Sequence, residues 1–177
     1  QVNYHSHLYA DDNVEMIVAV FQPYALKAFL NLPISLLHNQ EVSGYDLENK
    51  HLKRLAAQIF DCENTSLCIG AIEQWLLSQI AGALTLKTEY NIKRITAVIR
   101  QLLIMPETSV KELTSIACLS KKQFERLFNE LVGANPKEYA RIVRFQKSLK
   151  LLQHYPEDAN QAQLAYQCGY ADQSHFI

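Results

Sequence analysis

The chain lacks the features that mark several large classes of protein. It has no run of about 18 apolar residues, so no segment is long enough to cross a bilayer as a helix. The nearest approach, residues 66–86, is interrupted by Glu73, Gln74 and Gln79. No basic stretch followed by an apolar one begins the sequence, so nothing predicts export. We therefore expect a cytoplasmic protein with no membrane partner.

Signatures of catalysis and of metal binding are also missing. There is no glycine-rich phosphate loop and no GxSxG nucleophile motif. Cys62 and Cys68 do not form a CxxC pair, and His5 and His7 lack further ligands at a suitable spacing. We expect no enzyme activity, no catalytic residue, no metal site and no cofactor. The four cysteines are interpreted as small buried thiols in a reducing compartment.

The net charge of −1 is unevenly distributed along the chain. Residues 109–155 hold nine Lys and Arg against four Asp and Glu, a net of +5, whereas residues 1–108 and 156–177 each carry a net of −3. A basic segment inside an acidic chain is typical of proteins that contact phosphates of nucleic acid. Four of its basic residues have an alternative reading, as the solvated face of an amphipathic helix: Lys137, Arg141, Lys147 and Lys150.

The basic segment begins with a pattern that predicts a short helix, a tight turn and a second helix. Apolar residues repeat at the spacing of one helix face on both sides of the turn: Leu113, Ala117, Phe124, Leu127 and Phe128. Ser109 is followed three residues later by Glu112, and Ser120 by Gln123. Both pairs are typical of capping boxes, in which two side chains satisfy free amides at a helix start.

The same pattern recurs about fifty residues later. The places of Leu113, Ala117, Ser120 and Phe124 are taken in turn by Leu164, Cys168, Asp172 and Phe176. Between the copies, Gly133 is placed to end one helix, and Asn135-Pro136 begins a long apolar-periodic helix that we expect to reach about Gln153. One helix should therefore join two helix-turn-helix units.

Together these blocks resemble the DNA-binding domain of the AraC/XylS family of bacterial transcription regulators. The resemblance rests on residues 119–128, residues 133–136 with Tyr139 and Arg144, Leu164-Ala165, and residues 168–170 with Asp172, Ser174, His175 and Phe176. It covers roughly the last ninety residues, including the spacing between the blocks. It implies that two recognition helices enter adjacent major grooves on one face of the DNA.

The chain departs from the family pattern in two places. Cys118 stands where the family usually has a glycine with positive φ, and a side chain there costs about 1 kcal/mol. By the resemblance, the chain stops at Ile177 inside the second recognition helix, and it begins at Gln1 without an initiator methionine. We expect that both ends are cut, and that the natural protein continues with a basic and aromatic segment.

The candidate reading residues follow from helix geometry. On the first recognition helix the outward residues are Lys121, Lys122, Gln123, Glu125, Arg126 and Asn129. By the resemblance, Lys122, Glu125 and Arg126 occupy base-reading positions, where Arg126 can pair with guanine and Glu125 can accept from cytosine. Alternatively, Glu125 forms a salt bridge to a neighbouring lysine and does not touch DNA. In the second copy the outward residues are Gln173, Ser174 and His175, of which His175 is alternatively a helix cap.

The upstream part of the chain carries weaker patterns. Residues 14–21 form an apolar run rich in Val and Ile, which predicts a strand. Helical spacing recurs over residues 25–32, 47–60, 67–86 and 90–105, the last being the expected first helix of the DNA-binding domain. The pattern around residues 18–33 resembles the end of a barrel-type sensory domain, most of which would precede Gln1.

With 177 residues, 49% of them hydrophobic, the chain fits two small domains. We predict a mainly α protein: a partial α+β regulatory domain over residues 1–86, and a double helix-turn-helix domain, incomplete at its C-terminus, over residues 87–177. The predicted function is sequence-specific regulation of transcription on double-stranded promoter DNA, controlled by an effector at the N-terminal domain. Candidate partners are RNA polymerase, a small-molecule effector and a second copy in a homodimer. The alternative is a helical protein-interaction module that does not bind DNA.

Overall fold

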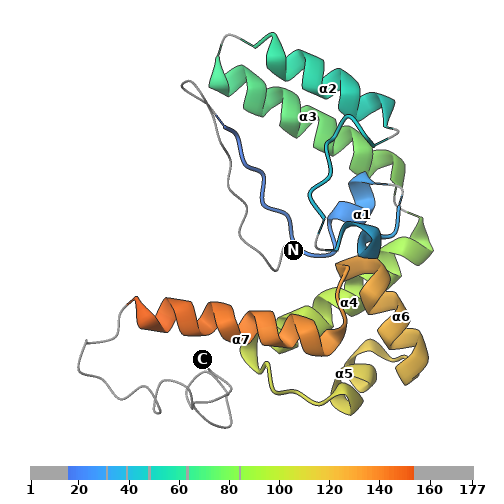
Figure 1. The fold of residues 1–177 in the computed structure, drawn as a ribbon. Coiled ribbons are helices and arrows are strands. Elements are labelled where there is room, and N and C mark those ends of the chain that lie inside the picture. Colours follow the sequence, from blue (N-terminus) through green and yellow to red (C-terminus); the bar gives the residue numbers. More distant parts are fainter. Residues whose placement is uncertain are drawn as a thin grey trace. The chain divides into compact units, whose positions relative to one another are not determined.

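The computed structural model describes residues 16–153, apart from positions 31, 39, 48, 63 and 84. This range is built of helices and loops and contains no strand, which confirms the mainly α class. In chain order its elements are α1 (Leu26–Phe29), the 3-10 turn η1 (Ile34–Leu37), α2 (Lys50–Phe60), α3 (Thr65–Ala83), α4 (Leu86–Ile104), α5 (Val110–Ala117), α6 (Lys121–Val132) and α7 (Pro136–Leu152) (Figure 1). None of these helices is long and apolar enough to span a membrane.

The chain divides into two compact units. The upstream unit runs to Tyr90 and includes Glu130–Gly133, and the downstream unit comprises Asn91–Asn129 and the chain from Ala134 onward. The roles assigned above to residues 1–86 and 87–177 stay predictions.

The upstream unit is organised by α2 and α3, which lie side by side (Figure 1). The side chain of Asn49 begins α2 by accepting hydrogen bonds from the backbone amides of His51 and Leu52, each at 3.0 Å. This cap explains why the helix starts at Lys50 rather than at the expected residue 47. Phe29 of α1 packs between Phe21 and Trp75, with ring centroids 5.1 and 6.1 Å away, and so holds α1 against α3.

The strand expected over residues 14–21 is absent from the described part of the chain. Residues 14 and 15 lie outside the described residues, and residues 16–22 belong to no helix or strand and follow the extended trace seen in Figure 1. Their apolar side chains are largely exposed, Val20 by 91%. A strand is defined by hydrogen bonds to a neighbouring strand, and the described chain supplies none. The β part of the expected α+β regulatory domain is therefore not shown.

The downstream unit has one apolar core to which four helices contribute. Its buried residues are Ile95, Val98, Ile99 and Leu102 of α4, Leu113 and Ala117 of α5, Phe124 and Phe128 of α6, and Tyr139, Ala140 and Val143 of α7. The spacing of three and four along each helix places these side chains on one face. The helical periodicity read from the sequence is thus the periodicity of this core.

Both predicted capping boxes form. Glu112 accepts from the Ser109 amide at 2.9 Å and from the Ser109 hydroxyl at 2.7 Å, while the Glu112 amide donates to Ser109 Oγ at 3.2 Å. The Ser120 amide donates to Gln123 Oε1 at 3.3 Å, and the Gln123 amide donates to Ser120 Oγ at 3.4 Å. The hydrogen bonds from the Ser109 side chain and backbone lower the pKa of Glu112, because they stabilise its carboxylate.

The turn between α5 and α6 contains a non-glycine residue in the left-handed region. Cys118 has φ 52° and ψ 48°. Its amide donates to Ser115 O, and the Leu119 amide donates to Thr114 O, each at 3.1 Å. This pair of bonds is a Schellman motif, which normally places glycine at the left-handed position. The thiol of Cys118 is exposed, whereas Cys68 is buried and Cys62 half-buried. The prediction that the cysteines are buried is therefore wrong for Cys118.

The start of α7 also follows its sequence signals. Gly133, with φ 80°, ends the preceding helix, and Asn135 accepts from the Glu138 amide at 2.9 Å. Pro136 occupies the first turn, where its missing amide hydrogen costs nothing. The helix ends at Leu152, one residue short of the expected Gln153.

Replacing Cys118 by glycine should stabilise the protein. Glycine adopts φ 52° without the steric cost of a Cβ, so we expect the free energy of unfolding to rise by about 1 kcal/mol. Urea unfolding followed by circular dichroism measures this difference. Cys118→Ala is the matched control, since it removes the thiol and keeps the Cβ, and it should bring no gain. A glycine variant no more stable than the alanine variant would contradict the argument.

The capping box at Ser109 should make stability depend on pH. Because its pKa is lowered in the folded state, Glu112 contributes stability above its unfolded pKa and loses that contribution as the pH falls through the folded pKa. Glu112→Gln retains an acceptor without the charge. The wild type should therefore be the more stable at about pH 7, and the difference should shrink as the pH is lowered below the ordinary range of a carboxyl group. Thermal unfolding of both proteins across this range tests it, and a difference independent of pH would count against it.

Candidate nucleic-acid interface

The position of α6 relative to α5 is fixed by aromatic side chains. Phe124 and Phe128 are 0% exposed, with centroids 5.7 Å apart in an edge-on arrangement, and Leu113 of α5 is 2% exposed. Phe128 also meets Tyr139 of α7 edge-on at 5.8 Å. Edge-on pairs add to the burial energy of the rings and restrict their orientation. Because this packing fixes the orientation of α6, the face of α6 opposite the two rings has one defined orientation within the downstream unit.

That opposite face carries the predicted reading residues. All six are exposed: Lys121, Lys122, Gln123, Glu125, Arg126 and Asn129. Leu127 is half-buried and marks the edge of the packed face. An exposed row of long polar side chains on the second helix of a helix-turn-helix is the arrangement that reads base edges in a major groove. Contact of these residues with DNA stays a prediction.

Gln123 and Glu125 differ in whether their side chains interact with neighbouring residues of the chain. The side chain of Gln123 accepts from Ser120 Oγ at 2.8 Å, so its carboxamide oxygen is used at the helix start. Within the described part of the chain, Glu125 forms no ion pair with Lys121 or Lys122. The carboxylate of Glu125 is therefore exposed beside the guanidinium-bearing Arg126, as the base-reading interpretation requires.

The second predicted recognition helix falls beyond the described residues. Its candidate residues Gln173, Ser174 and His175 lie there, as do Leu164 and Cys168. Their roles stay predictions that rest on the sequence pattern.

The basic residues of α7 divide into two kinds. Lys137, Arg141, Lys147 and Lys150 are exposed, as both of their interpretations require. Arg144 is half-buried and lines a cavity of about 360 Å³ together with Leu102 and Leu113. Arg144 therefore contributes to the packing of the downstream unit, whereas the other four residues lie on the exposed side of α7.

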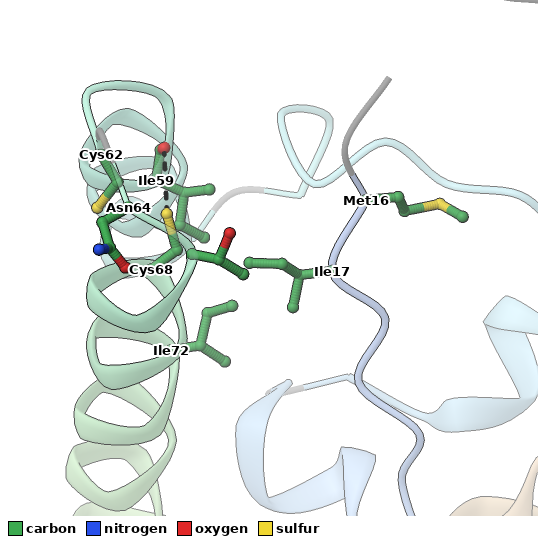
Figure 2. Close-up of a pocket in the computed structure, with 8 residues that line it drawn as sticks. Met16, Ile17, Ile59, Cys62, Asn64, Cys68 and Ile72 are labelled. Carbon is green, nitrogen blue, oxygen red and sulfur yellow. Dashed lines mark hydrogen bonds between the residues drawn. The ribbon is translucent and has the colours of Figure 1, made fainter. Parts of the chain in front are cut away.

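A further cavity lies in the upstream unit, and no sequence pattern indicated it. Its volume is about 500 Å³, and its walls come from the extended segment, the end of α2 and the beginning of α3. In Figure 2, Ile17 points from the extended segment toward the helices, opposite Cys68 and Ile72. These residues are far apart in sequence and share no periodicity, so only the folded chain brings them together. Among the described residues, no group of three or more His, Cys, Asp or Glu is placed to hold a metal ion.

Comparison with known proteins supports the helix-turn-helix interpretation. A family described as "Helix-turn-helix domain" matches residues 113–177. A curated protein from Photobacterium leiognathi, named "Probable transcriptional regulator LumQ", is 29% identical over 126 residues, which are 69% of this chain and 50% of that protein. The chain thus spans about half the length of this relative. No solved structure matches.

The matched region contains the turn, the capping box of α6 and the buried aromatic residues described above. It also extends through the second copy of the repeat. The resemblance found in the sequence is thereby confirmed. The downstream part of this chain is thus similar to a helix-turn-helix family over residues 113–177, in agreement with the resemblance to AraC-type regulators found in the sequence.

Proposed function

We propose that this protein is a transcription regulator that binds double-stranded promoter DNA in a sequence-specific manner. The observation that carries the proposal is the exposed polar face of α6, whose direction is fixed by Phe124 and Phe128. The name of the relative in Photobacterium leiognathi agrees with it.

In this proposal Arg126, Glu125 and Lys122 read base edges, and Lys121, Gln123 and Asn129 flank them. Arg126 would pair with O6 and N7 of a guanine, and Glu125 would accept from N4 of a cytosine. Lys147 and Lys150 of α7 would contact phosphates, which position the protein without specifying sequence. A second reader containing Gln173, Ser174 and His175 would occupy the adjacent major groove.

The remaining parts of the proposal concern control. Residues 1–86 would form part of a regulatory domain that responds to a small-molecule effector, and residues 87–177 the DNA-binding domain. RNA polymerase and a second copy of the chain are the proposed protein partners. The protein would act in the bacterial cytoplasm, where promoter DNA is accessible.

Arg126→Ala should reduce specificity more than general affinity for DNA. The loss of a bidentate contact to guanine should weaken binding to the preferred site by about 1–3 kcal/mol and leave random DNA nearly unaffected. The preferred site is obtained by selection from random duplexes, and both affinities are measured by gel shift. Lys147→Ala, which removes an exposed charge from α7, is the matched control and should lower both affinities together. Equal losses on both DNAs for Arg126→Ala would show that this residue contacts phosphate instead.

The salt dependence of binding separates DNA recognition from the alternative of a protein-interaction module. Neutralising about five phosphates, as the charge of residues 109–155 allows, gives a slope of about −4 to −5 in a plot of log affinity against log salt. Fluorescence anisotropy of a labelled duplex at several salt concentrations measures the slope. Failure to bind any selected duplex at low salt, with binding to a protein partner insensitive to salt, would favour the alternative.

A further inference from the structure

The chemical character of the cavity in the upstream unit is set by neutral side chains. Four of the residues that line it are apolar, two carry thiols and two are uncharged polar residues: Met16, Ile17, Ile59, Ile72, Cys62, Cys68, Asn64 and Thr65. No charged residue of the described chain lines it. An ion seated against these side chains would lose part of its hydration without gaining a counter-charge from the described residues, so this lining favours uncharged molecules.

The size and the polar groups of the cavity suit a small organic molecule. About 500 Å³ lies within the range of roughly 300–1,000 Å³ that is typical of ligand sites, which are mainly apolar with a few polar groups that orient the ligand. The carboxamide oxygen of Asn64 is engaged at the start of α3, where it accepts from the Ser66 amide at 2.7 Å, so the carboxamide nitrogen is the group of this residue that would orient a ligand. The carboxamide nitrogen of Asn64 is a donor group by its chemistry.

The two thiols differ in their surroundings. Cys68 is buried and its Sγ donates to the backbone oxygen of Ile59 at 3.8 Å, the contact drawn as a dashed line in Figure 2. Cys62 is half-buried at the cavity wall. A molecule that fills the cavity would therefore cover Cys62 and leave the partner of Cys68 unchanged.

A second hollow in the same unit is lined by polar and charged residues. The neutral lining is therefore a property of the cavity beside Ile17 and not of the whole unit. The second hollow lies between α2 and α3 and is lined by His51, Arg54, Gln58 and Gln74, among others. An anionic molecule would be attracted to Arg54 there. Charge on a ligand is thus the property that separates the two hollows.

We propose that the cavity bounded by Ile17, Cys62 and Ile72 binds a small, uncharged, mainly apolar molecule. Such a molecule would contact the extended segment, the end of α2 and the start of α3 at once, and so hold three elements together. This binding site would be the place where the proposed effector acts. Its role in regulation therefore rests on the proposed function. The binding itself can be tested without DNA.

Protection of Cys62 from a thiol reagent tests the site. The 177-residue protein is treated with N-ethylmaleimide, and the labelling rates of Cys62 and Cys118 are followed by peptide mass spectrometry. Cys118 is exposed and does not line the cavity, so it serves as an internal reference. Octan-1-ol should slow the labelling of Cys62 several-fold and leave Cys118 unchanged. Octanoate, which has the same chain length and a negative charge, should protect Cys62 at least tenfold more weakly.

Matched variants on α3 locate the effect. Ile72→Phe fills the cavity and should abolish the protection by octan-1-ol, whereas Leu77→Phe should retain it, because Leu77 is 67% exposed on the same helix and does not line the cavity. Circular dichroism verifies that both variants are folded. If Ile72→Phe unfolds, it is replaced by Ile72→Val, which enlarges the cavity. Ile72→Val should alter the protection of Cys62, whereas Leu77→Phe should not. Equal protection by octanoate, or protection that is the same in the Ile72 and Leu77 variants, would overturn the proposal.

A gel shift with the selected duplex, run on the same samples, keeps the two proposals apart. Protection of Cys62 without any DNA binding would remove the proposed function and retain the ligand site. DNA binding without protection would do the reverse.

Discussion

The packing of Phe124 and Phe128 under α6 is the interaction on which the downstream unit depends. Both rings are fully buried, and the edge-on contact of Phe128 with Tyr139 connects α6 to α7. Truncating such a ring to alanine costs about 3–5 kcal/mol, a large part of the 5–15 kcal/mol that stabilises a typical domain. The direction of every exposed side chain on α6 follows from these two rings. Loss of either ring should therefore disturb the whole exposed face of α6 that is proposed to read DNA.

The local signals in the downstream sequence were sufficient to predict its helices, because each boundary depends on residues close together in the chain. Ser109 with Glu112, Ser120 with Gln123, and Asn135 before Pro136 all occupy the positions that the sequence indicated. The exposure of Arg126 and Glu125 could be predicted for the same reason, since the helical phase is set by Phe124 and Phe128. What these residues contact is a property of a partner molecule, and that could be reached only through resemblance.

Less of the upstream structure could be predicted from the sequence, because it depends on contacts between residues that are distant in the chain. The apolar run at residues 14–21 has the composition of a strand, but strand formation requires a neighbour that the run itself does not specify. The cavity shows the same limit, as Ile17, Cys62 and Ile72 have no common pattern in the sequence. Cys118 is a different case. Its left-handed backbone was anticipated from the resemblance, whereas its exposure depends on which way a single side chain leaves the turn.

The shortness of α5 limits which part of the downstream unit could be transplanted into another protein and keep its fold. At eight residues, α5 is well below the length of about 12–15 residues at which an isolated helix becomes even marginally stable in water. Its helical state is supplied by its caps and by the burial of Leu113 and Ala117 among residues of three other helices. A peptide cut from residues 109–132 would therefore lose its fold together with its exposed face. The smallest transferable module must include α4 and α7, so the proposed recognition of DNA would be a property of the whole unit rather than of α6 alone.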